Sequence, residues 1–365
     1  MRSTVMRVST EAIAHNARVF REAIPRKVRM MCVIKADAYG HDSVATAKKL
    51  VDAGADAFAV AIVEEARALR EAGVDAPILI LGGAAEESLR QAVRCGASQA
   101  VYDARALRIL QDEARMTGKP AKAHLKLDTG MSRIGIRDAE GLNTLLEQWK
   151  RCPDVHMEGA FTHFCAAEND PEFTELQRSR FQAFLDIIRA AGYTPIAHAA
   201  ATSAMLRPEL QFDMVRPGIG LYGSGVPELQ DQLQYAQTLV TKPIRIQKIQ
   251  KGDTVGYGRT FTAQRDSVIM TLPIGYGDGY LRILSNRASV LVKGRRAPQV
   301  GRVCMDMLMV DITDIPDVTL EDEVVLMGRQ GDAVITPDEL AELAQTIPYE
   351  IMLNFGPRVR VEIVD

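Results

Sequence analysis

The sequence has few cysteines, and no two of them form a close pair. Five cysteines occur among 365 residues, an odd number, and none are spaced as C-x-x-C. Disulfide-rich domains need even sets of cysteines, and structural zinc sites usually contain such close pairs. We therefore expect neither a disulfide framework nor a metal site. Reduced thiols are typical of the cytoplasm, which is the location we expect.

Long hydrophobic runs and an excess of one charge are also absent. No run approaches the ~20 apolar residues of a membrane span, and no apolar signal-peptide core follows the charged start of the chain. Lys and Arg number 44 against 47 Asp and Glu, which gives a net charge of −3. We therefore expect neither a membrane nor a nucleic acid as a partner. The apolar fraction of 47% is typical of a folded globular protein, and the length suggests about two domains.

The first part of the chain alternates strand-like and helix-like segments. Between about residues 28 and 223, short apolar runs are separated by segments whose apolar residues have helical spacing. Parallel strands covered by helices produce this rhythm, and eight such strands are the number in a closed (β/α)8 barrel. A doubly wound open sheet is the competing architecture, but its usual Gly-x-Gly-x-x-Gly turn after the first strand is missing. The expected strands are Val28–Ile34, Ala57–Ile62, Pro77–Leu81, Gln99–Tyr102, Ala123–Leu127, Gly159–Thr162, Ile196–Ala199 and Met214–Tyr222.

The second part of the chain is mostly β in character. Its apolar runs are joined by Gly, Asp and Pro turns, and one helix is expected at Pro337–Gln345 with Thr336 as its N-cap. The predicted fold is therefore α/β, with a TIM-like (β/α)8 barrel over residues 10–230 and a mostly β C-terminal domain over residues 231–365. The expected strands of this domain are Leu239–Ile249, Ser267–Leu272, Ala288–Val292, Ala297–Val300, Met307–Asp311 and Glu323–Met327.

Candidate functional residues follow the expected barrel strands, where barrel enzymes place their sites. The first strand runs directly into Lys35, and partial burial would lower the pKa of this amine and make it a nucleophile for a carbonyl. A surface lysine that ends a strand is the other interpretation. Lys126 alternates with apolar residues in the fifth strand, so it is a buried cation that needs an anionic partner or a modification. Arg133, in the Gly-rich loop beyond, could bind a carboxylate with two hydrogen bonds.

The last three barrel strands end in further polar residues. His163 follows the sixth strand, Thr202 and Ser203 follow the seventh, and Arg216 and Gly218 lie in the eighth. Hydroxyl groups and bare backbone N–H groups at this position suit a phosphate. A single histidine would more often be structural, but the convergence of these residues predicts a functional site at the carboxyl ends of the barrel strands.

Several segments of the chain resemble those of a known family. Val33–His41 is similar to the cofactor-lysine signature of the alanine racemases, which are fold-type III enzymes that use pyridoxal 5′-phosphate. The similarity continues in order through Lys126–Gly135, Thr162–Phe164, Met214–Gly223, Gly256–Thr260, Ile274–Gly279, Gly301–Asp306 and Pro348–Glu350. It implies that the barrel binds the cofactor and that the chain forms a head-to-tail homodimer. It also implies that residues 1–9 join the C-terminal domain, which contributes to the active site of the partner subunit.

The resemblance also implies roles for individual residues. Lys35 would hold the cofactor and act as one base, and Tyr257 of the partner subunit would be the other base. Racemisation removes the α-proton on one face and returns a proton on the other, which two opposed bases can do. Arg216 would face the pyridine nitrogen, with His163 hydrogen-bonded to it. The phosphate would contact Tyr39, Thr202 or Ser203, Gly218 and Ile219. The substrate carboxylate would contact Arg133 and Met305. The supporting residues would be Lys126, which is carbamylated in many relatives, and Tyr276, Arg282, Arg302 and Asp306.

The implied activity is the interconversion of L- and D-alanine, which would supply D-alanine for peptidoglycan. The sequence departs from some relatives at Pro357, where they carry a phosphate-binding tyrosine, so a racemase for serine or for a wider set of amino acids is an alternative. A fold-type III decarboxylase would carry an acid in place of Arg216. A cofactor-binding protein without turnover is a further alternative, but small carriers of that kind lack the β domain, and Tyr257 argues against it.

Overall fold

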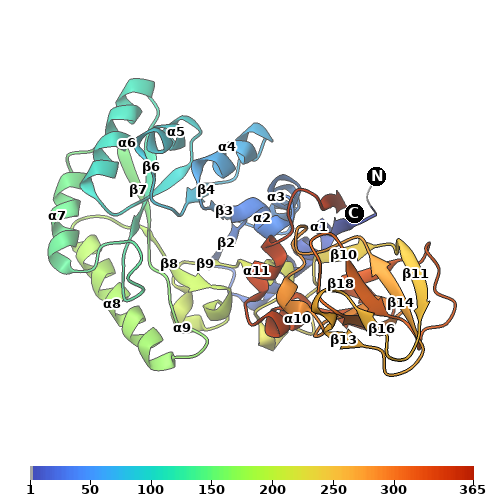
Figure 1. The fold of residues 1–365 in the computed structure, drawn as a ribbon. Coiled ribbons are helices and arrows are strands. Elements are labelled where there is room, and N and C mark those ends of the chain that lie inside the picture. The colour runs from blue at the N-terminus through green and yellow to red at the C-terminus, as the bar shows by residue number, and fades with distance from the viewer. Residues whose placement is uncertain (1–2) are drawn as a thin grey trace. The chain divides into compact units, whose positions relative to one another are not determined.

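The structure, a computed structural model, describes residues 3–365 and contains two compact units. One unit consists of residues 13–38 and 42–233, and the other of residues 3–12, 39–41 and 234–365. The first contains a closed parallel barrel with surrounding helices, and the second is mostly β (Figure 1). The expected fold class is confirmed.

Eight parallel strands form the barrel. Each strand pairs with the next in the sequence, and β2 pairs with β9 to close the ring. The apolar runs form strands here because both faces of each strand are buried, inside by the barrel and outside by helices. The strands are β2 (Arg29–Val33), β3 (Ala57–Val60), β4 (Ile78–Ile80), β5 (Ser98–Val101), β6 (Ala121–Lys126), β7 (Val155–Phe161), β8 (Ile196–Ala201) and β9 (Met214–Arg216).

Amphipathic helices cover the outside of the barrel, as Figure 1 shows for α4 to α8. In α6 the carboxylate of Asp103 accepts a hydrogen bond from Ala106 N (2.8 Å), and Gly118 at φ 66° ends the helix. The buried Glu113 of α6 pairs with Arg94 (2.7 Å) and Arg90 (3.2 Å) of α5. The helices are α1 (Thr10–Ala23), α2 (Lys35–Gly40), α3 (Ser43–Asp52), α4 (Val63–Glu71), α5 (Glu86–Arg94), α6 (Ala104–Thr117), α7 (Ala139–Trp149), α8 (Pro171–Ala190) and α9 (Pro208–Gln211).

The second unit is built on a ten-stranded sheet. The strand order is β11-β14-β17-β16-β15-β18-β10-β1-β20, and β19 pairs with β18. A separate hairpin pairs β12 (Thr254–Val255) with β13 (Phe261–Thr262). The sheet strands are β1 (Val5–Val8), β10 (Gln237–Thr241), β11 (Arg245–Ile249), β14 (Ser267–Leu272), β15 (Ser289–Val292), β16 (Arg295–Val300), β17 (Leu308–Asp311), β18 (Val324–Gln330), β19 (Ala333–Ile335) and β20 (Arg360–Ile363).

The N-terminal segment enters this sheet as β1, which pairs with β10 in antiparallel and with β20 in parallel orientation. Residues 1 and 2 of that segment lie outside the described residues. Two helices complete the unit, α10 (Pro337–Ala344) and α11 (Pro348–Leu353). The expectation of a single helix was wrong, because α11 is only six residues long and gives little periodic signal.

Two expected strands are shorter than the sequence indicated. The last barrel strand ends at Arg216, and its expected continuation turns into a short 3₁₀ helix, η2 (Ile219–Tyr222). The single strand expected at Leu239–Ile249 is two strands, β10 and β11, separated by Pro243. In both places a proline removes a backbone donor from the sheet, which explains the break.

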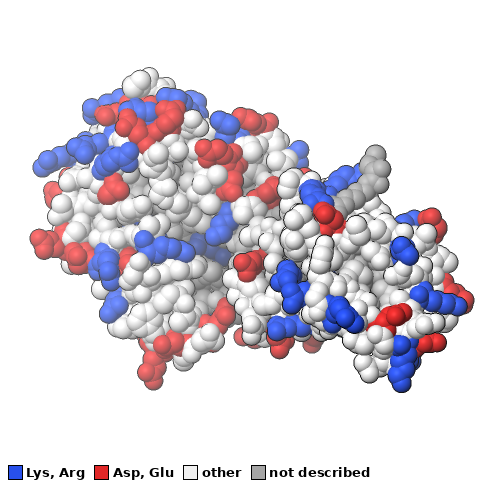
Figure 2. Space-filling model, viewed as in Figure 1, with Lys and Arg blue, Asp and Glu red and all other residues white. Residues whose placement is uncertain are grey.

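Charges of both signs are interspersed over the visible face of each unit in Figure 2. Within residues 3–365, no helix combines the length and hydropathy of a membrane span. Across that same range, no three His, Cys, Asp or Glu side chains lie together in a way that could hold a metal ion.

The N-cap of α10 provides a test of local stability. Thr336 Oγ1 accepts a hydrogen bond from Glu339 N (3.0 Å), as the sequence predicted. Replacing Thr336 with Ala leaves that donor unsatisfied, so we expect Thr336→Ala to lower the free energy of unfolding by about 1 kcal/mol. Urea unfolding measures this change. Thr336→Ser keeps the hydroxyl and should stay close to the wild type; an equal loss in both variants would contradict the capping role.

Candidate active site

Lys35 stands at the carboxyl end of β2, where the backbone makes an unusual turn. The four residues after it, Ala36 to Tyr39, all have positive φ, between 51° and 57°. Helix α2 is therefore a left-handed turn, which costs roughly 1–2 kcal/mol for each non-glycine residue. Glu65 of α4 accepts a hydrogen bond from Ala36 N (2.5 Å) and helps to hold the turn. Strain of this kind persists only where the surrounding structure holds the backbone in place, and it is frequent at active sites.

The Lys35 amine has the surroundings of a nucleophile. It is half-buried, and it makes no hydrogen bond or ion pair with any residue in the described part of the chain. Burial lowers the pKa of Lys35, the positive charge of Arg133 lowers it further, and Glu65 opposes both effects. A larger share of this amine is therefore neutral than in an exposed lysine.

Lys126 is a second perturbed amine, at the end of β6. It is 3% exposed; its Nζ donates to Leu127 O (2.6 Å) and lies 5.4 Å from the centre of the Phe161 ring. Burial lowers the pKa of Lys126 to about 7, with further contributions from Arg216 and Arg133. The buried cation expected from the sequence is thus close to half neutral at physiological pH.

The loop that follows Lys126 is shaped by Asp128. Its Oδ1 accepts hydrogen bonds from Gly130 N (3.0 Å) and Ser132 N (3.0 Å). Arg133 comes next in the chain and is exposed, and its charge lowers the pKa of Lys35, Lys126 and His163. Arg133 therefore lies near enough to these groups to act on them, and its guanidinium makes no hydrogen bond or ion pair with any described residue.

Arg216, at the end of β9, is the buried centre of this site. Its Nη1 donates to His198 Nδ1 (2.9 Å). Its Nη2 donates to Ala199 O (2.8 Å) and Thr162 O (2.9 Å), and His163 Nδ1 lies 3.3 Å away. Burial lowers the pKa of Arg216 to about 9, so the guanidinium remains charged at neutral pH. Its Nε makes no hydrogen bond with any described residue and is available as a donor to a ligand.

A chain of hydrogen bonds runs from Arg216 back through the barrel. His198 Nε2 lies 2.8 Å from His124 Nδ1. Because Arg216 can only donate, the ring nitrogen of His198 that faces its Nη1 must accept, and this neutral ring then carries its proton on Nε2. His198 donates in turn, so His124 is also protonated on Nε2 alone. Burial lowers the pKa of His124 to about 4 and of His163 to about 3, and holds that of His198 well below its usual range.

The loops after β8 and β9 meet at Thr202. This residue begins a short 3₁₀ helix, η1 (Thr202–Ala204), and its Oγ1 accepts hydrogen bonds from Gly218 N (2.8 Å) and Gly220 N (3.4 Å). Its hydroxyl proton remains available to a further acceptor. A side chain at Gly220 would place Cβ 2.6 Å from the Phe20 ring, so glycine is required here. Ser203 and Ile219 lie in the same pair of turns.

Tyr39 belongs to the β-rich unit, although it lies four residues after Lys35. It is buried, and its ring centre lies 5.7 Å from that of Tyr349 in α11. Burial raises the pKa of Tyr39 above its usual range, so its hydroxyl keeps its proton and can donate. Tyr349 lies in a segment that the resemblance includes, but no role was predicted for it.

The β-rich unit carries a second group of candidate residues around an open cavity of about 610 Å³. Tyr257, Met305 and Asp306 all line this cavity, and the Tyr257 side chain is 72% exposed. Tyr257 begins the 3₁₀ helix η4 (Tyr257–Arg259) after Gly256, whose φ of 73° favours glycine. A Cβ on Gly256 would lie 2.9 Å from the Met309 side chain.

The remaining candidates surround these residues within the same unit. Tyr276 N donates to Cys304 O (3.0 Å), which ties the Tyr276 loop to the Met305 loop. Asp306 accepts a hydrogen bond from Arg358 (2.6 Å), and Arg358 also pairs with the buried Asp278 (3.1 Å). The Arg302 guanidinium lies about 3.5 Å from the position of a Cβ on Gly258. Arg282 is exposed at the start of the 3₁₀ helix η5 (Arg282–Leu284).

The structure thus gathers one group of predicted residues in the barrel and another in the β-rich unit. The charges of Lys35, Lys126, Arg133 and Arg216 all act on His163, which shows that the barrel group converges. The roles of His124 and His198 beside Arg216 were not predicted. The sequence did contain a signal for His124. Alternate residues of a strand face the same side, so His124 faces the same side as Lys126, which was predicted as a site residue.

Polar side chains that converge at the carboxyl ends of eight parallel strands define a barrel enzyme. Comparison with known proteins specifies its family. The family model for the alanine racemase N-terminal domain matches residues 8–225, and the model for the C-terminal domain matches residues 236–363. The chain belongs to the alanine racemase family.

Individual relatives agree with this assignment. Alanine racemase 2 of Oceanobacillus iheyensis is 41% identical over 98% of this chain and 92% of its own length. Alanine racemase of Symbiobacterium thermophilum is 42% identical over 98% of this chain and 96% of its own length. The crystal structure of Bacillus anthracis alanine racemase with bound L-Ala-P is 36% identical and has a TM-score of 0.91, covering 100% of this chain and 96% of that one.

The forced tautomers of the histidine chain lead to a pH prediction. Between about pH 4 and 6.5 the unfolded chain binds a proton at His124 that the folded chain does not, so the free energy of unfolding falls as the pH is lowered through this window. The contribution of one histidine is about 1.4 kcal/mol per pH unit. ¹⁵N NMR at pH 5.5 should show all three histidines neutral, with His124 and His198 protonated on Nε2.

The variant His124→Asn isolates this contribution, because its Oδ1 can still accept from His198. Between about pH 4 and 6.5, the free energy of unfolding of this variant should fall less steeply than that of the wild type, by about 1.4 kcal/mol per pH unit. Identical pH dependence in the two proteins, or a protonated His124 at pH 5.5, would contradict the forced tautomer.

Proposed function

We propose that the protein interconverts L- and D-alanine with pyridoxal 5′-phosphate as cofactor and with two bases. The observation that carries this proposal is the half-buried, unpaired amine of Lys35 beside Arg133, in a chain that belongs to the alanine racemase family. The named activity of the relatives supports the reaction.

The donors in the barrel suit pyridoxal 5′-phosphate. The amine of Lys35 could bond to the aldehyde carbon, and the Nε–H of Arg216 could donate to the pyridine nitrogen. Thr202 would offer its hydroxyl proton to the phosphate, and the bond that its oxygen accepts from Gly218 N would hold it in place. Ser203, Ile219 and the protonated hydroxyl of Tyr39 are the further phosphate donors in this proposal. When bound, the cofactor supplies an electron sink that acidifies the α-proton of an amino acid.

Arg216 controls how strong that electron sink becomes. Its guanidinium is held by His198, Thr162 and Ala199 and keeps its own protons at neutral pH. It would therefore donate a hydrogen bond to the pyridine nitrogen of a bound cofactor and keep its own proton. The electron sink would then be weaker, which would limit side reactions and favour racemisation over decarboxylation or transamination.

The substrate would be held by Arg133 and by the backbone N–H of Met305. Lys35 would move a proton on one face of the substrate Cα, and Tyr257 of the partner subunit would move a proton on the other face. In this arrangement the barrel, residues 10–230, binds cofactor and substrate. The β domain, residues 231–365 with residues 1–9, contributes to the site of the second copy in a homodimer.

The proposal extends to the place of the reaction in the cell. D-Alanine for peptidoglycan would be the product, made in the cytoplasm. In this proposal Tyr276, Arg282, Arg302 and Asp306 line the entrance to the partner's site, where Tyr276 is 42% exposed.

The test combines a spectrum with an assay on one preparation. We expect the purified protein to absorb near about 420 nm because of the cofactor bound to Lys35, and to form D-alanine from L-alanine. Tyr257→Phe should lower turnover by about 10²–10⁴-fold and keep the absorbance, because it removes one base and leaves the barrel intact. Lys35→Ala should lose both the absorbance and the activity.

Tyr193→Phe is the matched control, since it removes a tyrosine hydroxyl from the loop after α8 and should leave turnover unchanged. L-Serine is assayed in parallel, because Pro357 removes a hydroxyl from the expected cofactor site. Preference for serine would keep the mechanism and change the substrate. A colourless protein that cannot be reconstituted, or turnover that ignores Tyr257, would refute the proposal.

Lys126 leads to a separate prediction about covalent modification. With its pKa lowered to about 7, a large share of the amine is neutral and can add carbon dioxide to form a carbamate, with release of a proton. The resulting anion would face the positive charges of Arg133 and Arg216. Protein equilibrated with ¹³C-bicarbonate should show a carbamate ¹³C NMR resonance. Lys126→Ala should lack it; a resonance that persists in this variant would contradict the assignment.

A further inference from the structure

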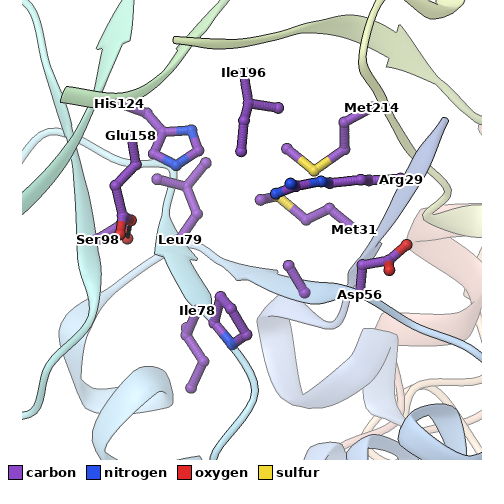
Figure 3. A pocket seen from close by; sticks show the side chains of 12 residues that line it. Arg29, Met31, Asp56, Ile78, Leu79, Ser98, His124, Glu158, Ile196 and Met214 are labelled. Atoms are coloured by element: carbon purple, nitrogen blue, oxygen red, sulfur yellow. Dashed lines mark hydrogen bonds between the residues drawn. The ribbon is translucent and has the colours of Figure 1, made fainter. Parts of the chain in front are cut away.

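A second cavity lies at the opposite end of the barrel from the proposed active site. It has a volume of about 260 Å³ and is lined where the strands begin, including by Arg29 of β2, Ser98 of β5 and Met214 of β9 (Figure 3). The sulfur-containing side chains of Met31 and Met214 and the aliphatic side chain of Ile196 give it an apolar wall. A space of this size suits a small molecule rather than a macromolecule.

Two unpaired donors face this cavity. The Arg29 side chain extends between Met31 and Met214 with its guanidinium toward the middle of the cavity (Figure 3), and it makes no hydrogen bond or ion pair within residues 3–365. His124 is only 4% exposed, and its Nδ1 is occupied by His198. The proton on His124 Nε2 has no acceptor among the described side chains and backbone groups, although this ring lines the cavity. Both groups can only donate, so each needs an acceptor.

Two carboxylates also line the cavity, but neither makes a hydrogen bond or ion pair with Arg29 or with His124 within residues 3–365, and each has other partners. Glu158 accepts from Ser98 Oγ (2.6 Å) and pairs with Lys122 (3.4 Å). Asp56 accepts from Met30 N (2.7 Å) and lies 3.6 Å from Arg21. Arg29 is therefore a lining charge that has no ion pair within residues 3–365, and its side chain is also exposed to solvent.

We propose that this cavity binds a short-chain carboxylate. The carboxylate would accept hydrogen bonds from the Arg29 guanidinium and from His124 Nε2–H, and its short aliphatic end would contact Met31 and Met214. A planar guanidinium matches a carboxylate in charge and geometry, and the apolar wall favours a ligand with a carbon chain over an inorganic anion. None of these residues is proposed to contact the cofactor or the substrate, although His124 is joined to Arg216 of the proposed active site through His198.

The test follows methionine methyl groups by NMR in the intact protein labelled with [¹³C-methyl]methionine. The resonances of Met31 and Met214 are assigned from Met31→Leu and Met214→Leu. Sodium propionate should shift both in a saturable way, while the same concentration of sodium chloride should not. Arg29→Gln should weaken the apparent affinity at least about tenfold, which corresponds to about 1.4 kcal/mol.

Arg26→Gln is the matched control, because it removes the same charge from the exposed turn just before β2 and leaves the cavity lining intact. It should bind propionate like the wild type. Arg133→Gln should also retain the shifts of Met31 and Met214, which separates this cavity from the proposed substrate site.

Three outcomes would overturn the proposal. The first is the absence of a saturable shift at Met31 and Met214 in the wild type. The second is equal affinity in the wild type and in Arg29→Gln, which would mean that the guanidinium does not hold the ligand. The third is a shift with inorganic phosphate or with alanine but none with propionate, which would assign the cavity to a different class of ligand.

Discussion

The charge of Arg216 is the constraint on which the barrel site depends. A guanidinium that is 3% exposed must direct its donors to acceptors, and here it finds two backbone carbonyls and the neutral nitrogen of a histidine. This requirement fixes the tautomer of His198, which in turn fixes that of His124. One permanent charge thereby sets the direction of a hydrogen-bond chain through the barrel.

The same positive charge organises the chemistry around it. Lys126 lies near Arg216, and its burial without a strong anionic partner makes it partly neutral. The pKa of Lys35 is also lowered, by burial and by the charge of Arg133. Two partly buried amines at the same end of the barrel destabilise the folded state. Groups with such lowered pKa values concentrate at sites where their reactivity is used. The left-handed turn after Lys35 adds backbone strain at the same place.

The sequence predicted most of the barrel because buried parallel strands are continuous apolar runs, and the polar residue that ends each run is easily seen. It failed where the signal was not periodic: prolines cut two strands short, and the six-residue α11 was missed. The His124–His198 contact joins residues 74 positions apart, so only the closure of the barrel creates it. The left-handed turn was also invisible, because Ala36 and Ala38 carry no preference for positive φ.

The β-rich unit raises a different question, since its candidate residues lie on an open surface. Tyr257 is 72% exposed and Met305 53% exposed, and Met307 beside them is 44% exposed. Large apolar side chains gathered around a cavity are uncommon on the surface of a protein that acts alone. A base that removes a proton from carbon also works best away from bulk water. Both arguments favour a covering surface from a second copy of the chain, so the proposed dimer would complete the site as well as hold it together.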